Sequence, residues 1–221
     1  LVPIGGGGLA AGVSTLAKLL NPNIQVIGVE PANAACMKAS LKAGKVVSLP
    51  SAVTIADGTA VKTPGDIVFP YIQKNLDDII TVEDEELIVN FLDVVENHKM
   101  VVDISGRLTA AALKHLYCMD KRVVSILSGG NMDIITMSSV VQHGLIERGR
   151  VFTVSVQLPD RPGELVNVAN VIAQLKGNVI RLEHNQFVSI NRNAAVELKI
   201  TLEAFGHEHK QQIVDALKEM G

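Results

Sequence analysis

The chain has 221 residues, 48% of them hydrophobic and 19% charged, which is enough apolar material for one large domain or two modest ones. Its net charge of -3, without a basic run, gives no electrostatic reason to expect nucleic acid or an anionic membrane surface as a partner, so small molecules are expected. The cysteines Cys36 and Cys118 lie far apart without a CxxC spacing, which disfavours a disulfide framework or zinc knuckle and predicts a cytoplasmic protein.

Four consecutive glycines, residues 5–8, follow a short apolar run at the start of the chain. We call them the tetraglycine loop. An Ala- and Leu-rich segment then predicts a helix over residues 9–20, whose buried face is expected to carry Leu9, Val13, Leu16 and Leu20. Bare backbone approaches a ligand closely, and a helix N-terminus adds unpaired N–H groups, so the loop predicts a phosphate site. Because the first residue is Leu and lies in a predicted strand, we expect the chain to start within a domain.

Strands and helices alternate through the next part of the chain. Strands are predicted over residues 24–29, 78–82 and 122–127, with a short apolar segment at 100–103. Helices are predicted over residues 32–42, 64–76, 83–97, 108–116 and 133–143. A strand, glycine loop, helix and strand in so few residues form a βαβ unit, which implies parallel strands.

A second glycine-containing loop, Ser128-Gly129-Gly130-Asn131, directly follows the strand predicted over residues 122–127. We call it the SGGN loop. In a parallel sheet it should lie at the same carboxyl edge as the tetraglycine loop, where open α/β folds bind their ligands. The two loops are therefore expected to flank one ligand.

The pattern changes between residues 146 and 150, which predicts one domain over 1–146 and another over 150–221. In the second part, strands are predicted over residues 151–158, 178–187 and 195–205, and helices over 165–175 and 207–220. This β-α-β-β-α order is one strand short of the ferredoxin-like arrangement. We therefore expect the last strand to be missing from the chain.

A dinucleotide site is the alternative that these residues leave open. Gly5-x-Gly7-x-x-Ala10 satisfies the G-x-G-x-x-G/A pattern, and Glu30 ends the next strand, where a ribose-binding acid belongs. On that interpretation the chain is a fragment of a dinucleotide-binding oxidoreductase. A P-loop is disfavoured because no Gly-Lys-Ser/Thr follows the glycines.

Five segments occur in the order typical of one enzyme family: GGGGL, VIGVEP, TIADG, DDIITVEDEEL and LSGGNMD, from residue 5 to residue 133. Through them, residues 1 to about 145 resemble the threonine dehydratases (threonine ammonia-lyases), which are fold-type II pyridoxal-phosphate enzymes. The resemblance implies an α/β fold of the tryptophan synthase β type with a parallel sheet. It also implies pyridoxal 5'-phosphate as the cofactor.

The resemblance also implies roles for individual residues. The phosphate of the cofactor would be bound by the tetraglycine loop and the residue after it, namely Gly5, Gly6, Gly7, Gly8 and Leu9. Ser128 would hydrogen-bond the pyridine nitrogen, with Gly129 beside it, and Gly58 would lie close to the ring. A neutral hydroxyl does not hold that nitrogen protonated as a carboxylate would, so the ring is a weaker electron sink, suited to β-elimination of water.

Several positions depart from the family pattern. The Schiff-base lysine of the family lies in a Ser-Phe-Lys-like motif upstream of the glycines, and this chain has no such motif. Its own lysines, Lys18 among them, are expected to be solvated, so no catalytic residue is assigned and the chain is predicted to be inactive alone. Relatives with a cation site have an aspartate where Cys36 stands, and a hard cation prefers oxygen ligands, so no metal site is predicted. Asp103 occupies a position near the pocket that is often glutamate.

Residues 150–221 resemble the ACT domain, an amino-acid-sensing module that follows the catalytic domain in many threonine dehydratases. Its D-x-P-G-x-L turn is matched at residues 160–165, which makes four residues candidates for binding an effector: Asp160, Gly163, Glu164 and Leu165. Asp160 alternatively only caps the following helix. His184, Asn185 and Gln186 are further candidates to line that site, whereas His207 and His209 are expected to bind no metal.

The expected function is pyridoxal-phosphate-dependent conversion of L-threonine to 2-oxobutanoate, or of L-serine to pyruvate, with release of ammonia. The resemblance links this activity to isoleucine biosynthesis, while the sequence leaves a catabolic role open, and regulation through the ACT domain is expected. ACT domains usually pair, so a homo-oligomer, such as a dimer, is expected. The alternative is a non-catalytic module that senses an amino acid and drives self-association.

Overall fold

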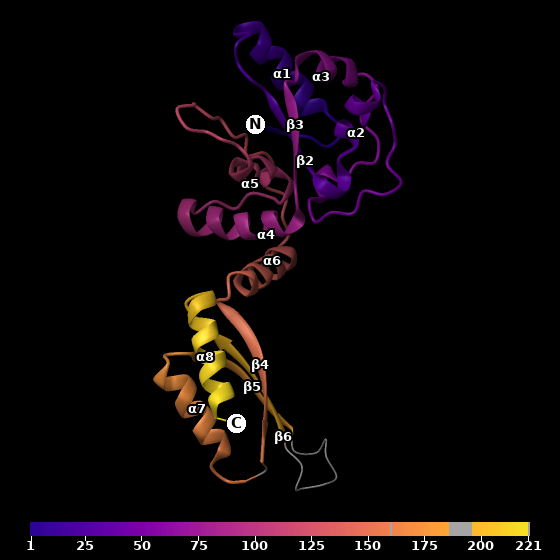
Figure 1. Ribbon diagram of the computed structural model, residues 1–221. Coiled ribbons are helices and arrows are strands. Elements are labelled where there is room, and N and C mark those ends of the chain that lie inside the picture. Colours follow the sequence, from indigo (N-terminus) through magenta and orange to yellow (C-terminus); the bar gives the residue numbers. More distant parts are fainter. Residues whose placement is uncertain (160, 186–195, 221) are drawn as a thin grey trace. The chain divides into compact units, whose positions relative to one another are not determined.

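The structure, a computed structural model, describes residues 1–159, 161–185 and 196–220 (Figure 1). The chain divides into two compact units, Leu1–Val141 and Gln142–Gly221. Each unit has its own three-stranded sheet in the described residues, one parallel and one antiparallel. Within those residues, no helix is both long and apolar enough to cross a membrane.

The first unit is built on a parallel sheet in the order β1-β2-β3. Its strands are β1 (Val2–Pro3), β2 (Ile27–Pro31) and β3 (Asp78–Val82). Helix α1 (Gly8–Leu20) connects β1 to β2, which confirms the predicted α/β fold with parallel strands. β3 has the predicted bounds, because its β-branched residues Ile79, Ile80 and Thr81 favour a strand.

Of the other helices in the chain's first part, four are shorter than predicted, whereas the last, predicted over residues 133–143, continues to Glu147. They are α2 (Cys36–Ala43), α3 (Phe69–Asn75), α4 (Asp84–Asp93), α5 (Leu108–Ala111) and α6 (Ile134–Glu147). Short 3₁₀ turns occur at Ala32–Ala34, Asp57–Thr59, Ser105–Arg107 and Ala112–His115, and α4 continues into a π turn at Val94–His98. At the start of α4, Glu83 and Glu86 form a reciprocal capping box, which explains why the helix begins there.

The face predicted for α1 is wrong at three of its four residues, since only Val13 packs against the core. Its fully or nearly fully buried residues are the small ones Ala10, Ala11 and Ser14. Three of the side chains expected in the core are exposed: 46% for Leu9, 58% for Leu16 and 76% for Leu20. Small side chains let α1 approach α3 closely, where Asn75 Nδ2 donates to Thr15 Oγ1 at 3.0 Å, and Figure 1 shows these helices side by side.

The structure assigns no strand to residues 122–127, where the sequence predicts one, nor to residues 100–103. The backbone of the former nevertheless pairs with the first residue of the chain. Leu1 N donates to Val124 O at 2.7 Å, and Ile126 N donates to Leu1 O at 3.2 Å, as in a parallel pair of strands. The pairing goes no further because β1 is only two residues long and Pro3 has no N–H to donate.

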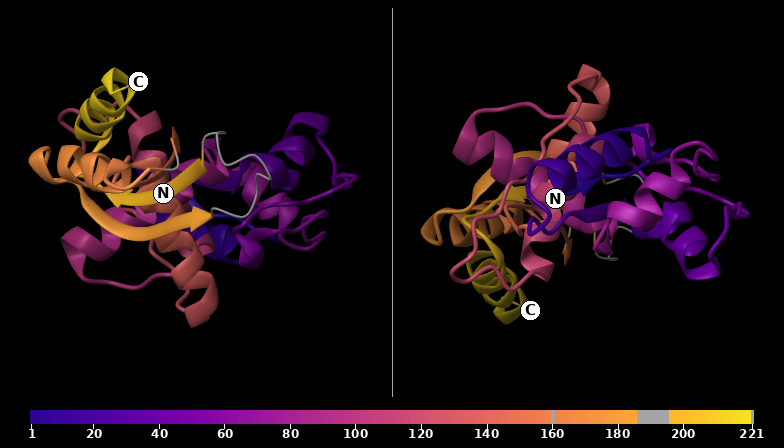
Figure 2. Two further views of the ribbon diagram at one scale, coloured as in Figure 1. Left: turned by 90° about the horizontal axis from the view of Figure 1, so that it is seen from below. Right: turned by 90° about the horizontal axis from the view of Figure 1, so that it is seen from above.

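The second unit is a three-stranded antiparallel sheet with two helices packed on one face (Figures 1 and 2). In chain order its elements are β4 (Val151–Leu158), α7 (Glu164–Gln174), β5 (Asn178–Asn185), β6 (Val196–Glu203) and α8 (His207–Glu219). The strand order is β4-β6-β5, so among the described residues the outer edge of β4 has no paired strand. β6 turns four predicted residues into the core: Val196, Leu198, Ile200 and Leu202.

Candidate cofactor site

The tetraglycine loop leaves β1 and ends where α1 begins. Gly7 has φ of 101°, and a Cβ there would lie 2.7 Å from Met37 Cε and 2.9 Å from Ile72 Cδ1, so only glycine fits. At Gly5 a Cβ would lie 3.2 Å from the carbonyl oxygen of Gly58. The fold itself therefore requires little or no side chain at two of the four positions.

Gly6 and Gly8 have the opposite surroundings. A Cβ at either position would meet no described atom within 4 Å, so packing within the chain does not explain why they are glycine. Open space in front of bare backbone, next to the N-terminal amides of α1, is the arrangement that accepts an anion. The loop therefore has two glycines that pack internally and two that face open space.

Gly58 and the SGGN loop both contact one short turn, Ser105–Arg107. A Cβ at Gly58 would lie 3.0 Å from Ser105 Oγ, and a Cβ at Gly106 would overlap the carbonyl of Ser128. Ser128 N donates to Gly106 O at 3.3 Å. Since Gly58 also lies against Gly5, these contacts bring the predicted residues Gly5, Gly58 and Ser128 into one region of the first unit.

Asp103 and Arg107 hold this turn in place. Asp103 Oδ1 accepts the N–H of Gly106 at 2.5 Å, while its other carboxylate oxygen occupies the space that a Cβ of Gly129 would need. Gly129 has φ of 86°, so it too must be glycine. Arg107 is fully buried and donates from Nε to Asp103 O and from Nη1 to Leu87 O, both at 3.1 Å.

The burial of Arg107 was not predicted from the sequence. Its guanidinium lies 4.3 Å from the centroid of the Phe91 ring, and burial lowers its pKa to about 10, opposed by the charge of Asp103. Its position directly before an apolar helical segment was the one indication of burial in the sequence, but arginines are rarely fully buried. The buried guanidinium of Arg107 thus holds the turn that carries Ser105 and Gly106.

Glu30 is fully buried, and its carboxylate binds the N-terminal end of α2. Its two carboxylate oxygens accept the N–H groups of Met37 and Lys38, each at 2.8 Å, at the N-terminal end of that helix. Burial raises the pKa of Glu30 to about 7, although these two hydrogen bonds and the charge of Lys38 lower it. Because the side chain is fully buried, neither of its oxygens is accessible to a ribose hydroxyl.

Cys36 lies between Glu30 and the tetraglycine loop, with its Sγ 4.0 Å from the carbonyl oxygen of Gly5. Burial, and then the charge of Glu30, raise the pKa of this thiol to about 11, so it stays protonated. Within the described residues, no group of three or more His, Cys, Asp or Glu side chains could hold a metal ion.

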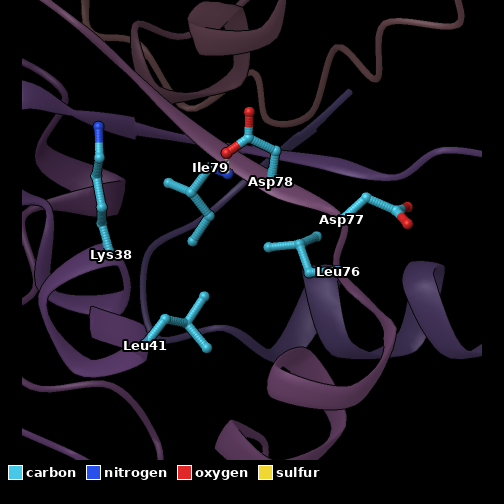
Figure 3. A pocket seen from close by; sticks show the side chains of 6 residues that line it. All are labelled: Lys38, Leu41, Leu76, Asp77, Asp78 and Ile79. Carbon is cyan, nitrogen blue, oxygen red and sulfur yellow. Dashed lines mark hydrogen bonds between the residues drawn. The ribbon is translucent and has the colours of Figure 1, made fainter. Parts of the chain in front are cut away.

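A cavity of about 240 Å³ opens beside the amino end of β3, the opposite end of that strand from the one where ligands of parallel sheets bind (Figure 3). The apolar side chains of Leu41, Leu76 and Ile79 line it. Asp77, at its rim, is already bound to the N–H of Val26 at 2.6 Å and to Lys18 Nζ at 2.8 Å. Lys18, expected to be solvated, thus joins α1 to the residue that precedes β3, and we assign this cavity no part in the cofactor site.

A second cavity, of about 270 Å³, lies in the second unit at the start of α7. Its lining includes three of the predicted effector residues together with His184: Gly163, Glu164, Leu165 and His184. Leu158, Pro159, Arg161 and Pro162 complete it. The predicted Asp160 and Gln186 lie outside the described residues, as does the side chain of Asn185.

His209 has both ring nitrogens occupied by backbone groups. Nδ1 accepts the N–H of Phe205 at 3.0 Å, and Nε2 donates to the carbonyl of Leu175 at 2.7 Å. Its ring also stacks on Phe205 with 5.0 Å between centroids. His209 therefore connects the start of α8 to the end of α7.

The family model of pyridoxal-phosphate dependent enzymes matches residues 1–129. The chain belongs to this family. This confirms the predicted family and cofactor, and the dinucleotide alternative, already disfavoured by the commitment of Glu30 to α2, is wrong.

The chain is similar to several threonine-converting enzymes of this family. It is 39% identical to an L-threonine ammonia-lyase of Geobacter sulfurreducens over 100% of this chain and 56% of that protein. It is 35% identical to the L-threonine ammonia-lyase of Thermotoga maritima, with 96% of this chain and 53% of that protein covered. The chain thus spans about half the length of these curated relatives.

Solved structures of the family have the same fold. The processed form of threonine deaminase isoform 2 from Solanum lycopersicum is 35% identical, with a TM-score of 0.61 over 64% of this chain and 43% of that chain. Maize serine racemase is 35% identical, with a TM-score of 0.56 over 66% of this chain and 46% of that chain. Both likenesses support the α/β fold described above.

Two observations bear on whether the chain's own residues fit the cofactor of this family. The open side of the tetraglycine loop, at Gly6 and Gly8, has room for a phosphate. The hydroxyl of Ser105 is buried next to Gly58 and has no hydrogen-bond partner among the described residues. A cofactor bound between the two loops would place its phosphate in the open space at Gly6 and Gly8 and offer a hydrogen-bond partner to the hydroxyl of Ser105. The residues therefore fit pyridoxal phosphate.

Proposed function

We propose that the two glycine loops of the first unit hold pyridoxal 5'-phosphate, and that the chain is part of a threonine ammonia-lyase. The whole enzyme would convert L-threonine to 2-oxobutanoate and ammonia, and L-serine to pyruvate and ammonia. One observation carries the proposal: in a chain of this family, Gly58 and the Ser105–Arg107 turn link the tetraglycine loop to the SGGN loop. The relatives named L-threonine ammonia-lyase support the choice of substrate.

Each loop has a distinct role in this proposal. The amides of Gly5, Gly6, Gly7, Gly8 and Leu9 bind the phosphate, because they combine bare backbone with the positive end of α1. Ser128, next to Gly129, hydrogen-bonds the pyridine nitrogen, and Gly58 leaves room for the ring. When bound, pyridoxal phosphate supplies the electron sink for removal of a substrate's α-proton. Because the Ser128 hydroxyl is neutral, it does not hold the pyridine nitrogen protonated, which favours elimination of water over a long-lived carbanion.

The 221-residue chain is proposed to bind the cofactor without turning over substrate, because no lysine in it is assigned as the Schiff-base residue. Equilibrium dialysis of the chain against pyridoxal phosphate measures the binding, and 2-oxobutanoate released from threonine measures the activity. Binding without turnover is expected. A Gly6→Val variant should lose most of the binding while keeping the fold, since its side chain would fill the phosphate space. Turnover of threonine by the chain alone would refute the inactivity proposal.

For residues 150–221 we propose an ACT domain that binds an amino acid and pairs with a second copy. The 270 Å³ cavity at the start of α7, lined by Gly163, Glu164 and Leu165, supports the ligand site, with Asp160 beside it in sequence. A free amino acid has a carboxylate that the N-terminal amides of α7 can bind. The outer edge of β4, unpaired among the described residues, supports a dimer.

Calorimetric titration of the full chain with isoleucine and valine tests the ACT proposal. A Gly163→Val variant should weaken binding, while the same change at Gly44, which lies in the other unit, should not. Size-exclusion chromatography with light scattering reports the oligomeric state.

We also propose a cytoplasmic location for the protein. The free cysteines, the buried Cys36 and the half-buried Cys118, agree with this location.

A further inference from the structure

Ser105 is a buried residue that neither the sequence pattern nor the family roles above assign to the site. It lies in the 3₁₀ turn before α5, and only 7% of its surface is exposed. Its Oγ has no hydrogen-bond partner among the described residues. A buried hydroxyl without a partner costs free energy, so its presence calls for a group that completes it.

The surroundings of Ser105 indicate where that group would be. Its Oγ faces Gly58, 3.0 Å from the position of a Cβ there, so a side chain at that residue would crowd the hydroxyl. The backbone of the next residue, Gly106, packs against the backbone of Ser128. Ser105 therefore lies between the two segments that the proposed function places at the cofactor ring.

The backbone of this turn is held in place, so Ser105 as a whole cannot move away from Gly58. Gly106 N–H is held by Asp103 at 2.5 Å, and Arg107 is bound to Asp103 and to Leu87. Residues on both sides of the hydroxyl are thus fixed by other contacts. The hydroxyl can change rotamer within this frame, but its Cα stays beside Gly58.

We propose that Ser105 Oγ hydrogen-bonds a polar atom of the pyridine ring system of pyridoxal phosphate, and not its phosphate. This rests on the proposed function, because it assumes that the cofactor lies between the two loops. The ring is the part of the cofactor that belongs beside Gly58 and Ser128, whereas the phosphate belongs at Gly6 and Gly8. Ser105 is on this proposal a cofactor-binding residue.

The test compares Ser105→Ala with Ser125→Ala in the full chain. Ser125 is the matched control, because its Oγ is also buried without a partner but lies on the segment before the SGGN loop. Removing either hydroxyl relieves an unpaired group, so the melting temperature without ligand should rise by about 2–4 °C in both variants. This rise also shows that both variants fold.

The affinities are measured by equilibrium dialysis with pyridoxal phosphate, pyridoxal and inorganic phosphate as separate probes. Ser105→Ala should weaken binding of the first two by roughly 2- to 10-fold, the loss of one neutral hydrogen bond, and leave inorganic phosphate unchanged. Ser125→Ala should leave all three unchanged.

Three results would overturn this assignment. Unchanged affinity for pyridoxal phosphate in Ser105→Ala, with binding to the original chain intact, would remove Ser105 from the site and leave the proposed function standing. An equal loss in Ser125→Ala would show a general effect of removing a buried hydroxyl. Absence of binding to the original chain would overturn the cofactor site and the role of Ser105 together.

Discussion

The two units of the chain build their candidate sites by opposite means. In the first unit the important positions are those where a side chain is missing: Gly5, Gly7, Gly58, Gly106 and Gly129 all lie where a Cβ would press on a neighbour. In the second unit the cavity lies at the start of one helix, and all of its lining residues but Gly163 carry a side chain. A site made of backbone tolerates almost no substitution, whereas a site made of side chains can change its ligand by changing them.

The two sheets also differ in where they place their polar side chains. The outward face of the antiparallel sheet is covered by polar pairs across strands, such as Thr153 with Thr201 at 3.0 Å and Asn178 with Glu203 at 3.2 Å. The parallel sheet instead buries Glu30 completely and uses it to hold α2. The antiparallel sheet therefore exposes polar side chains on its outward face, whereas the parallel sheet buries a carboxyl group.

The contrast within the tetraglycine loop gives the largest expected effect. Gly7→Val should destabilise the first unit by about 2–6 kcal/mol, because its Cβ would overlap Met37 and Ile72 and its φ is positive. Gly6→Val should leave stability within about 1 kcal/mol, since its side chain meets open space. Urea unfolding followed by circular dichroism measures both, and equal losses would contradict the division of the loop into packed and open glycines.

In the second unit the core of β6 should control stability. Leu198→Ala is expected to cost about 2–5 kcal/mol, because this side chain is fully buried against the helices. The adjacent Lys199 points to the other face, so Lys199→Ala is the control and should change little. Hydrogen exchange of the β4 to β6 amides localises the effect. Protection lost in the first unit but kept in the second would argue against separate cores.

The buried Glu30 should make the first unit less stable as pH rises. Its pKa is raised from 4.5 to about 7 in the folded chain, so the folded state holds a proton that the unfolded state releases. Its contribution to stability is full below pH 4.5 and is lost as pH rises through 7, in total about 3 kcal/mol. Unfolding free energies of Glu30→Gln should vary less between pH 5 and 8 than those of the original chain. The exposed Glu85→Gln is the control and should behave like the original chain.

The smallest expected effect concerns His209 in the second unit. His209→Ala removes the hydrogen bonds to Phe205 and Leu175 and should cost about 1–2 kcal/mol. His98, exposed in the first unit, is the control, and its change to Ala should be neutral. Thermal unfolding of the full chain measures both changes. A neutral His209→Ala would show that the connection between α7 and α8 does not depend on this ring.

Much of the fold could be predicted from local pattern alone. The alternation of Val196, Leu198, Ile200 and Leu202 predicted β6 and its buried face, and DIITV predicted β3 with its bounds. The leucines of α1 misled the same method, because both their face and the alanine face are apolar. Periodicity cannot choose between two apolar faces of one helix; the width of the space next to α3 does.

For the site, the sequence by itself determined the positions of the bare loops, because consecutive glycines after apolar strands have few other uses. It could not indicate that Ser105 is left without a partner, that Arg107 is buried beneath it, or that Glu30 is committed to α2. The first two depend on contacts between segments 20 or more residues apart, such as Gly58 with Ser105 and Gly106 with Ser128, and the third on the hydrogen bonds from Met37 and Lys38 to a side chain that is fully buried. Burial and hydrogen-bond satisfaction are properties of the packed chain, so only the tertiary structure decided them.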